Sequence, residues 1–345
     1  MKRILLSILV AALAVGVASS GEKKWRIVLS NDYAGNSWRQ SMISDWKTAA
    51  EMAIKAGIIE EAPIFTTNES SAAEQAAQLQ SLILEGYDAI VLNAASPEAL
   101  NSVVQDALDA GIVVVSFDNA ITLPTAWRLI TDFEYMGRRQ VEYVAQRFPQ
   151  GGNILEIRGL AGTYVNDAIH RGIVETLAKY PQFKVVGEVH GDWTSSVAQK
   201  AVAGILPSLP EITAVLTQGG DGYGAVKAFE ASGRKIPLVL MGNRYDEMEI
   251  WKEMLDKTGY DTISLSIAPG ASTIAFWEAI EVLNGKDVPK EIRLLPYVID
   301  THAKLERDLK NTPKGGVASI VYTQDWVQKM IANVKAGLPP PPDPE

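Results

Sequence analysis

The chain has 345 residues, a formal net charge of −9 and no cysteine. The lack of cysteine excludes disulfides, thiol catalysis, cysteine-ligated metal sites and lipid attachment at a leading cysteine. The acidic balance disfavours nucleic acid as a partner, because phosphate binding relies on a basic face.

The first twenty residues are predicted to be a cleaved secretory signal. A basic start is followed by a 15-residue apolar run, and the small residues Ala18 and Ser20 precede Gly21. The alternative is a membrane anchor, for which the run is short. Cleavage near Gly21 removes Lys2 and Arg3 and changes the net charge from −9 to −11. The expected location is therefore a bacterial periplasm or a similar exported space.

Short, β-branched and nearly all apolar segments recur along the roughly 325 remaining residues, which are enough for two domains. Strands of this kind are buried on both faces of a parallel sheet. The first set is 26–31, 63–67, 88–94 and 112–118. The second set is 153–159, 183–189, 212–219, 236–242 and 262–267.

Segments with helical periodicity alternate with these strands. Residues 71–86 have one apolar face and end at Gly86. Residues 96–111 begin with a cap at Ser96. This alternation predicts a doubly wound α/β architecture. The alternation halts at 119–129 and then starts again, which predicts two similar parallel-sheet (Rossmann-like) lobes rather than one large sheet.

Polar residues follow many of the predicted strands. In open parallel sheets, ligands bind outside the carboxyl ends of the strands. Amides, carboxylates, an arginine and aromatic rings at these positions suit a polyhydroxylated ligand better than they suit a reaction. The candidate ligand-binding residues are Asn31, Asn36, Trp38, Arg39, Asp118, Asn119, Asn166, Asp167, Gln218, Asp221 and Asn243.

Three of these candidates have a clear chemical role in such a site. Asp118 can accept hydrogen bonds from two neighbouring hydroxyl groups, and the indole of Trp38 can cover the apolar face of a sugar ring. Arg39 offers a planar fork of donors. A structural interpretation stays open for each: a core cap for Trp38, a solvated helix residue for Arg39 and a helix N-cap for Asp118. Trp193 is interpreted as structural, because its segment is predicted to be a loop and the start of a helix.

Nucleotide and metal chemistry are not expected. The segment GGDGYG at 219–224 does not fit the dinucleotide-binding glycine pattern. His170, His190 and His302 are scattered and have no metal-ligand spacing. We therefore expect no metal site and no cofactor.

Several segments resemble the periplasmic sugar-binding proteins of ABC importers, the ribose/galactose/xylose-type group of the type I periplasmic binding protein family. The resemblance covers about residues 25–310 and implies two lobes joined by a three-segment hinge, with the sugar bound between them. The similar segments are GNSWRQ (35–40), GYDAIVLNAASPEAL (86–100), AGIVVVSFDN (110–119), TQGGDGYGAVKAF (217–229) and VLMGN (239–243).

The resemblance also implies domain boundaries. The N-terminal lobe is expected at 25–125 plus 264–297, and the C-terminal lobe at 126–263 plus 298–336. The proline-rich, acidic residues 337–345 are predicted to be a disordered tail. The hinge crossings are expected near Pro124–Trp127, Asp261–Ser264 and Tyr297–Asp300.

Carried over residue by residue, the resemblance places Asn36, Trp38 and Arg39 in the N-terminal half of the site. Asp118 matches the aspartate with which the family binds sugar. Asn119 stands where an arginine is common, so its role is less defined.

In the C-terminal half, Gln218 and Asp221 fall in a loop that usually carries a ligand-binding asparagine. Asn243 falls where the family usually has an aspartate. Ile169 occupies a position that is often arginine, three residues before Gly172. These departures imply a pocket with fewer charges, which favours a polyol, a modified sugar or a less polar molecule over ribose or galactose.

The expected function is capture of a small sugar or polyol by the binding component of an ABC importer, a monomer that partners a membrane permease and its ATPase. Two alternatives stay open: a periplasmic sensor that feeds a chemoreceptor or kinase, and an exported enzyme on the same fold. An enzyme would need a nucleophile or an acid–base pair, and the loops show no convincing one. Pentose, hexose, furanose and polyol ligands are not distinguished.

Overall fold

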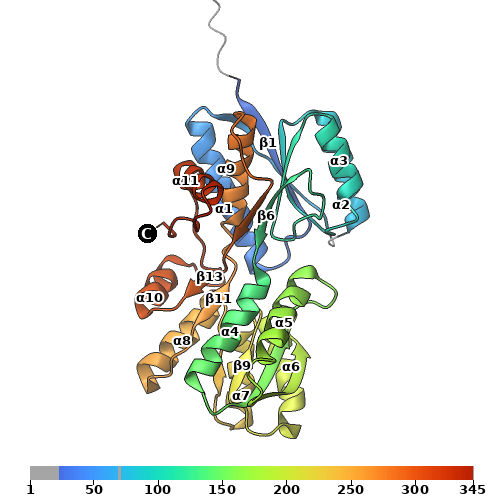
Figure 1. Cartoon of the computed structure of the whole chain (residues 1–345). Coiled ribbons are helices and arrows are strands. Elements are labelled where there is room, and N and C mark those ends of the chain that lie inside the picture. Colours follow the sequence, from blue (N-terminus) through green and yellow to red (C-terminus); the bar gives the residue numbers. More distant parts are fainter. Residues whose placement is uncertain (1–22, 69–70, 345) are drawn as a thin grey trace, which may run out of the picture.

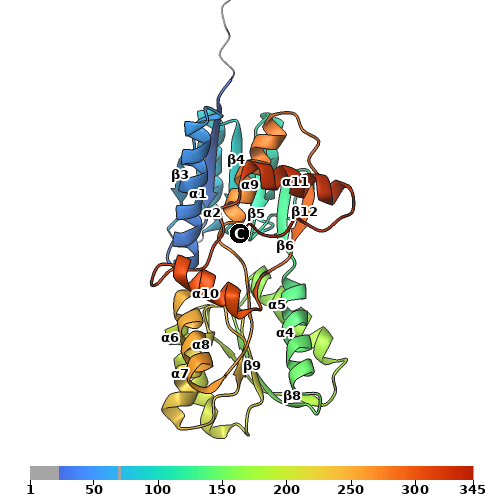
Figure 2. The same cartoon turned by 90° about the vertical axis from the view of Figure 1, so that its left-hand side faces the viewer.

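The computed structural model describes residues 23–68 and 71–344 and consists of two α/β lobes joined by several chain crossings (Figures 1 and 2). The predicted signal segment, residues 1–20, lies outside the described residues. Within the described ranges, no helix combines the length and the apolar content needed to cross a membrane.

The N-terminal lobe is built on a seven-stranded parallel sheet in the order β12-β6-β5-β4-β1-β2, with β3 also paired to β1. Side chains of β1 alternate between the faces, so Ile27 and Leu29 pack on one side of the sheet and Val28 on the other. The strands are β1 (Trp25–Asn31), β2 (Ile59–Glu61), β3 (Ile64–Thr66), β4 (Ala89–Asn93), β5 (Val113–Phe117), β6 (Trp127–Thr131) and β12 (Glu291–Leu294).

Five helices of the described chain cover the two faces of this sheet. Helix α1 begins after Asn36, whose side chain accepts a hydrogen bond of 2.8 Å from the backbone N–H of Arg39. Helix α2 ends at Gly86 in the left-handed conformation, as the sequence predicts. One face carries α1 (Ser37–Lys55), α9 (Ala271–Leu283) and α11 (Gln324–Lys335), and the other carries α2 (Ala72–Glu85) and α3 (Asn101–Asp109).

The C-terminal lobe contains a parallel sheet in the order β10-β9-β7-β8 and an antiparallel pair, β11 with β13. A parallel bridge between Met241 and Ser264 joins β11 to the end of β10. The strands are β7 (Gly152–Arg158), β8 (Phe183–His190), β9 (Ala214–Leu216), β10 (Leu238–Val239), β11 (Ser264–Ser266) and β13 (Tyr297–Ile299). The helices are α4 (Phe133–Arg147), α5 (Tyr164–Leu177), α6 (Ser195–Ile205), α7 (Gly222–Ser232), α8 (Tyr245–Thr258) and α10 (His302–Asn311), and a 3₁₀ turn, η1 (Leu206–Ser208), follows α6.

The chain passes between the lobes at 132, at 267–270, at 295–296 and again at 312–323. The first two crossings differ from the predicted boundaries at 125–126 and 263–264. Strand β6 pairs with β5 and β12 and so completes the N-terminal sheet before the chain leaves, and β11 pairs with β13 and bridges to Met241 in the C-terminal lobe. The fourth crossing was not predicted. It returns α11 to the N-terminal lobe, where Trp326, Val327 and Met330 join the core cluster of α1 and α9.

Strand direction decides which ends of the two sheets face each other. The chain runs from the carboxyl end of β6 directly into the C-terminal lobe, so every strand parallel to β6 points its carboxyl end toward that lobe. Likewise β11, which is parallel to β10, leads from its carboxyl end into the N-terminal lobe. We call the loops that therefore meet the inter-lobe face; it comprises 32–39, 94–96 and 118–120 together with 159–163, 191–194, 218–221 and 242–244.

The tail after α11 makes specific contacts. Residues 337–344 have no regular secondary structure, yet side chains near and within α11 hold them, in contrast to the disorder that their composition predicts. The indole of Trp326 donates to Pro342 O at 2.9 Å, and the hydroxyl of Tyr322 donates to Asp343 Oδ1 at 2.9 Å. These aromatic partners lie outside the tail, so its own composition gives no sign of them.

Glu278 of α9 is the least compensated acid of the N-terminal core. Its side chain is fully buried, and neither carboxylate oxygen has a hydrogen-bond partner among the described residues. Burial raises its pKa to about 8 from a usual 4.5. The carboxyl group is therefore neutral in the folded protein near pH 7, whereas it is ionised in the unfolded chain.

We predict that Glu278→Gln flattens the pH dependence of stability. A raised carboxyl pKa contributes stability that is complete below the unfolded value of 4.5 and is lost as pH rises to about 8. The full loss corresponds to roughly 5 kcal/mol in the free energy of unfolding. Urea unfolding at pH 5 and pH 8 should show a smaller loss in the variant than in the wild type. Equal losses in both proteins would contradict this assignment.

Candidate ligand-binding face

Arg39 links three elements of the N-terminal lobe. Its Nη1 lies 2.8 Å from Asp118 Oδ2, and its Nη2 lies 3.2 Å from Asp32 Oδ1. The three side chains are between 7% and 12% exposed. A mostly buried cation between two carboxylates forms a rigid polar group with strong hydrogen-bonding capacity at the end of the sheet.

Asp118 stands directly after β5 in a left-handed conformation with φ of 57°. This backbone region is uncommon for residues other than glycine, although aspartate and asparagine tolerate it. Asn93, at the end of β4, donates from Nδ2 to Asp118 Oδ2 at 3.2 Å. Two partners on one oxygen fix the carboxylate.

Trp38 is partly buried against the N-terminal core. Its indole Nε1 donates to Ile267 O at 2.9 Å, in the second crossing segment. The guanidinium of Arg39 lies 5.0 Å from the centre of the indole ring. Trp38 therefore ties the start of α1 to a crossing segment and supports Arg39 from the side.

The three asparagines of this lobe that the sequence analysis named as candidates are engaged by the backbone. Asn31 Nδ2 donates to Tyr33 O at 2.6 Å, Asn36 caps α1, and Asn119 Nδ2 donates to Ala94 O. These bonds shape the loops around Asp118. The three side chains lie at the inter-lobe face or directly beside it, at the end of β1.

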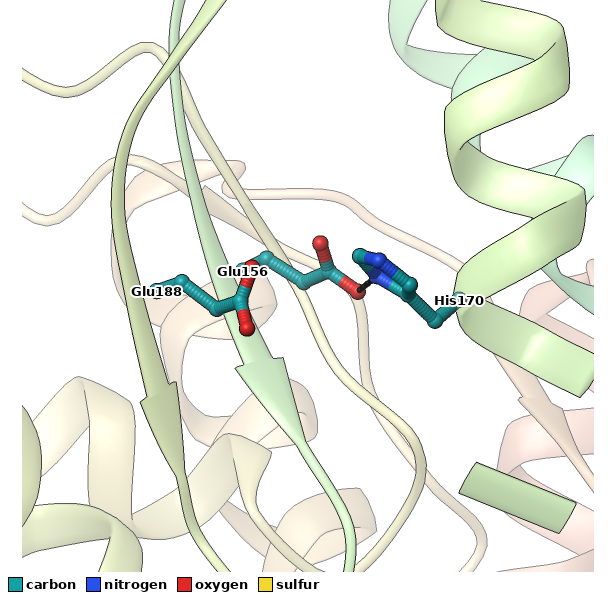
Figure 3. Close-up of side chains that lie close together, drawn as sticks. All are labelled: Glu156, His170 and Glu188. Atoms are coloured by element: carbon teal, nitrogen blue, oxygen red, sulfur yellow. Dashed lines mark hydrogen bonds and ion pairs between the residues drawn. The ribbon is translucent and has the colours of Figure 1, made fainter. Parts of the chain in front are cut away.

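The C-terminal lobe presents a polar network centred on Arg158 at the end of β7. Beneath this network, Glu156 accepts from His170 Nδ1 at 2.8 Å (Figure 3). Burial raises the pKa of Glu156, and the contact with His170 opposes the rise. Arg158 itself contacts Glu188 Oε1 at 3.0 Å.

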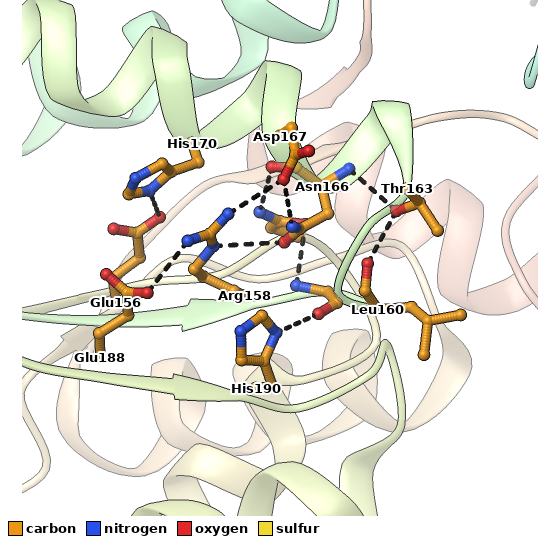
Figure 4. A network of polar contacts seen from close by, with 11 residues as sticks. Glu156, Arg158, Leu160, Thr163, Asn166, Asp167, His170, Glu188 and His190 are labelled. Carbon is orange, nitrogen blue, oxygen red and sulfur yellow. Dashed lines mark hydrogen bonds and ion pairs between the residues drawn. The ribbon is translucent and has the colours of Figure 1, made fainter.

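Arg158 also joins the predicted residues of this lobe (Figure 4). Its Nη2 lies 3.2 Å from Asp167 Oδ1, and its Nε donates to Asn166 Oδ1 at 3.4 Å. Gln218 accepts from Gly159 N at 2.9 Å and donates to Asn166 O at 3.1 Å. The structure thus brings Asn166, Asp167 and Gln218 together, with Arg158 as an organiser that the sequence analysis missed.

Asp221 and Asn243 are turned into the protein. Asp221 is fully buried, and burial followed by the nearby Glu247 raises its pKa well above the usual range. Asn243 donates to Ala318 O at 2.9 Å and accepts from the hydroxyl of Ser266, so its amide is used to join β11 to the fourth crossing. Asn243 therefore supports the face from below.

Glu247 fixes the glycine-rich loop. Its carboxylate accepts from the backbone N–H groups of Gly220, Gly222 and Gly242 at 2.9 to 3.0 Å. The guanidinium of Arg244 packs over Gly220, where any Cβ would lie 2.4 Å from Arg244 Nε. Gly220 therefore has to be glycine for this arrangement.

Arg244 makes a hydrogen bond between the lobes. Its Nη1 donates to the hydroxyl of Ser37 at 2.9 Å, and Ser37 is the first residue of α1. The two residues are 207 positions apart, so no local sequence pattern could reveal the contact. It shows that the inter-lobe face is narrow at this point.

Trp193 follows β8 and adopts a left-handed conformation, as does Asp192 before it, with φ of 52° and 53°. Two consecutive residues of this kind are costly and are concentrated at functional sites. The indole lies over Gly159, where a Cβ would stand 2.2 Å from Trp193 Cε2. The structural interpretation of Trp193 therefore accounts only for its contact with Gly159, and its place at the inter-lobe face suggests a second role.

Two pockets lie beside the crossing segments, and the first reaches the inter-lobe face at Ser37. One of about 640 Å³ is bounded by α1, the end of α10 and residues 312–321. The other, of about 260 Å³, is bounded by the crossing segments and residues 339–343. Neither is lined by a candidate ligand-binding residue, so the case for the inter-lobe face depends on strand direction and on the polar groups gathered there.

A family model described as "Periplasmic binding protein domain" matches residues 27–287. Curated relatives include a xylitol-binding protein of Mycolicibacterium smegmatis, 29% identical over 58% of this chain, and a D-ribose/D-allose-binding protein of Pseudomonas aeruginosa, 29% identical over 54%. The matches span 58% and 60% of those relatives, which is less than two thirds of their length.

Solved structures agree with this match. An ABC transporter solute binding protein from Thermobispora bispora has a TM-score of 0.84 and 33% identity, and the match covers 93% of this chain and 99% of that one. The myo-inositol binding protein of Caulobacter, at 20% identity, has a TM-score of 0.70 over 83% of this chain and 96% of its own, which shows the shared fold. The chain therefore belongs to the periplasmic binding protein family, in its two-lobed type I form.

Proposed function

We propose that this protein is the substrate-binding component of an ABC importer for a sugar or polyol. It is exported to the periplasm, holds its ligand at the inter-lobe face and delivers it unchanged to a permease. The observation that carries this proposal is the group of Arg39, Asp118 and Asp32 at the carboxyl ends of β1 and β5. The binding activities of the related proteins support the same ligand class.

Each lobe contributes a different part of the binding site. Asp118 accepts hydrogen bonds from ligand hydroxyl groups, while Arg39 holds its carboxylate in place and donates to a neighbouring oxygen. From the opposite side, Trp193 covers the apolar face of the ring. Asn166 and Gln218 keep the loop beside Trp193 in place through the bonds described above. These polar and aromatic side chains are held in place before the ligand binds. Less conformational entropy is therefore lost when the ligand binds.

Because each lobe supplies different contacts to the ligand, ligand binding favours closure of the lobes. A ligand that contacts both lobes stabilises the closed form, because only that form satisfies it from both sides. The Arg244–Ser37 hydrogen bond exists only when the lobes are close. It therefore adds to closure without contacting the ligand.

We predict that Asp118→Asn lowers ligand affinity while the fold is kept. Asparagine tolerates the left-handed backbone, and loss of a charged acceptor costs about 1.5 to 3 kcal/mol, or roughly 10- to 150-fold in affinity. The ligand is first found by thermal-shift screening of sugars and polyols, since a ligand that binds the native state raises Tm. Calorimetry then compares the variants.

The matched control for this experiment is Asp256→Asn. Asp256 forms a surface pair with Lys252 and is 59% exposed, so its loss should leave affinity unchanged. Unaltered affinity in Asp118→Asn would remove Asp118 from the site, and a screen in which no sugar or polyol raises Tm would overturn the proposed ligand class.

We predict that Ser37→Ala favours the open form. The substitution removes the acceptor of the inter-lobe hydrogen bond and should lower ligand affinity by about 3- to 10-fold. Small-angle scattering should show a larger radius of gyration for the ligand-free variant and an unchanged one when ligand saturates it. Ser41→Ala, one turn further along α1, is the control. Identical scattering of Ser37→Ala and wild type without ligand would refute this role.

We predict that Gly159→Ala displaces the indole of Trp193. The new methyl group would overlap the ring, which costs about 1 to 3 kcal/mol and alters tryptophan fluorescence. Gly204→Ala on α6 is the control, because no atom lies within 4 Å of the added carbon and alanine favours the helix. If Gly159→Ala keeps wild-type ligand affinity, Trp193 is not part of the binding surface.

A further inference from the structure

Glu156, Glu188 and His170 converge on one face of the C-terminal sheet (Figure 3). Glu156 on β7 and Glu188 on β8 are direct partners in the parallel register, so both carboxylates project from the same face. His170 reaches them from α5, which packs above. One donor atom from each residue lies within 4.8 Å of the other two.

The register creates an electrostatic problem. Like charges placed directly opposite each other on neighbouring strands are unfavourable. Glu156 is 1% exposed, and among the described residues its carboxylate accepts one hydrogen bond, from His170 Nδ1 at 2.8 Å. Asp167 adds a third carboxylate nearby, while Arg158 supplies one permanent positive charge to the group.

The cluster opens to solvent on one side. Exposure of the side chains rises from 2% for Glu156 to 27% for His170 and 42% for Glu188. The buried acid Glu156 therefore lies deepest, the imidazole of His170 is partly exposed, and Glu188 is the ligand most accessible to an ion from solvent.

We propose that this cluster is a binding site for a divalent transition-metal cation of the Zn²⁺ type. His170 Nδ1 and one oxygen each from Glu156 and Glu188 supply three ligands, and water completes a tetrahedral set. The imidazole favours zinc-like ions, because Mg²⁺ and Ca²⁺ prefer ligand sets made of oxygen alone.

The geometry requires one adjustment. Ligands about 2.1 Å from a tetrahedral ion are roughly 3.4 Å apart, so the exposed Glu188 must move inward. Arg158, now 3.0 Å from Glu188 Oε1, is the competing cation (Figure 4). When the metal binds, Arg158 is left with Asp167 and Asn166, which it already contacts at 3.2 and 3.4 Å.

This competition predicts the direction in which zinc affinity changes when Arg158 is replaced. A network of ion pairs with no metal site would show no such change. The mature protein is titrated with ZnCl₂ by calorimetry and with a fluorescent chelator, in the absence of sugar. We expect binding of one ion per chain and a rise in Tm. Glu188→Gln and His170→Ala should weaken binding by at least roughly 10- to 100-fold. Arg158→Gln should strengthen it, because it removes the competing charge.

The matched control is His302→Ala. His302 pairs with Asp261 at 3.3 Å but is 56% exposed, and no third ligand is recorded beside it in the described chain. Its loss should leave zinc binding unchanged. Bound Co²⁺ should show the intense visible bands of tetrahedral coordination in the wild type and lose them in His170→Ala.

Two outcomes would overturn the proposal. One is the absence of stoichiometric binding in both the wild type and Arg158→Gln, which would leave only a network of ion pairs. The other is zinc binding that His170→Ala and Glu188→Gln do not weaken, which would place the ion elsewhere. Both zinc-binding measurements are made without sugar. Their outcome therefore tests the metal site and leaves the proposed transport function untouched.

Discussion

The first three passages between the lobes fix which ends of the two parallel sheets face each other, and this constraint brings the polar groups together. A chain that leaves β6 or β11 at its carboxyl end and enters the other lobe forces the two sheets to point at each other. Residues that each sheet places after its strands, such as Asp118 and Trp193, are then held on opposite walls. No single loop has to be long for this, because parallel topology supplies the arrangement.

The buried carboxylates of this protein are stabilised in three different ways. Asp118 shares the guanidinium of Arg39 with Asp32, and Glu247 accepts three backbone N–H groups. Glu278 has neither kind of partner and is neutral instead. The first two arrangements lie at or beneath the inter-lobe face, where fixed charge is useful for binding. The third lies in the core of the N-terminal lobe, where charge would only cost stability.

Much of this architecture could be predicted from the sequence. The strand–helix alternation gave the two parallel-sheet lobes, and the position of Asp118 after an apolar strand gave its place at the sheet end. Contacts between distant segments could not be predicted from the sequence. Examples are the hydrogen bond of Arg244 to Ser37 and the packing of α11 on the N-terminal core, because both depend on how the lobes meet. The convergence of His170 with Glu156 and Glu188 depends on the register of an edge strand, and spacing along the chain does not encode register. The left-handed backbone at Asp192 and Trp193 could not be predicted, because this conformation at two residues other than glycine has no clear sequence signal.

The contacts of the proline-rich tail have a practical consequence for using this protein as a sugar reporter. Pro342 and Asp343 are hydrogen-bonded to Trp326 and Tyr322, and the same tail borders a pocket lined by Ile267, Leu295 and Pro296 of the crossing segments. Under the proposed closure, a fluorophore attached near Asp343 would lie against the crossing segments. Such a label would convert the proposed lobe movement into an optical signal. A dye on the far end of α8 would move with the C-terminal lobe as a whole and would give no such signal.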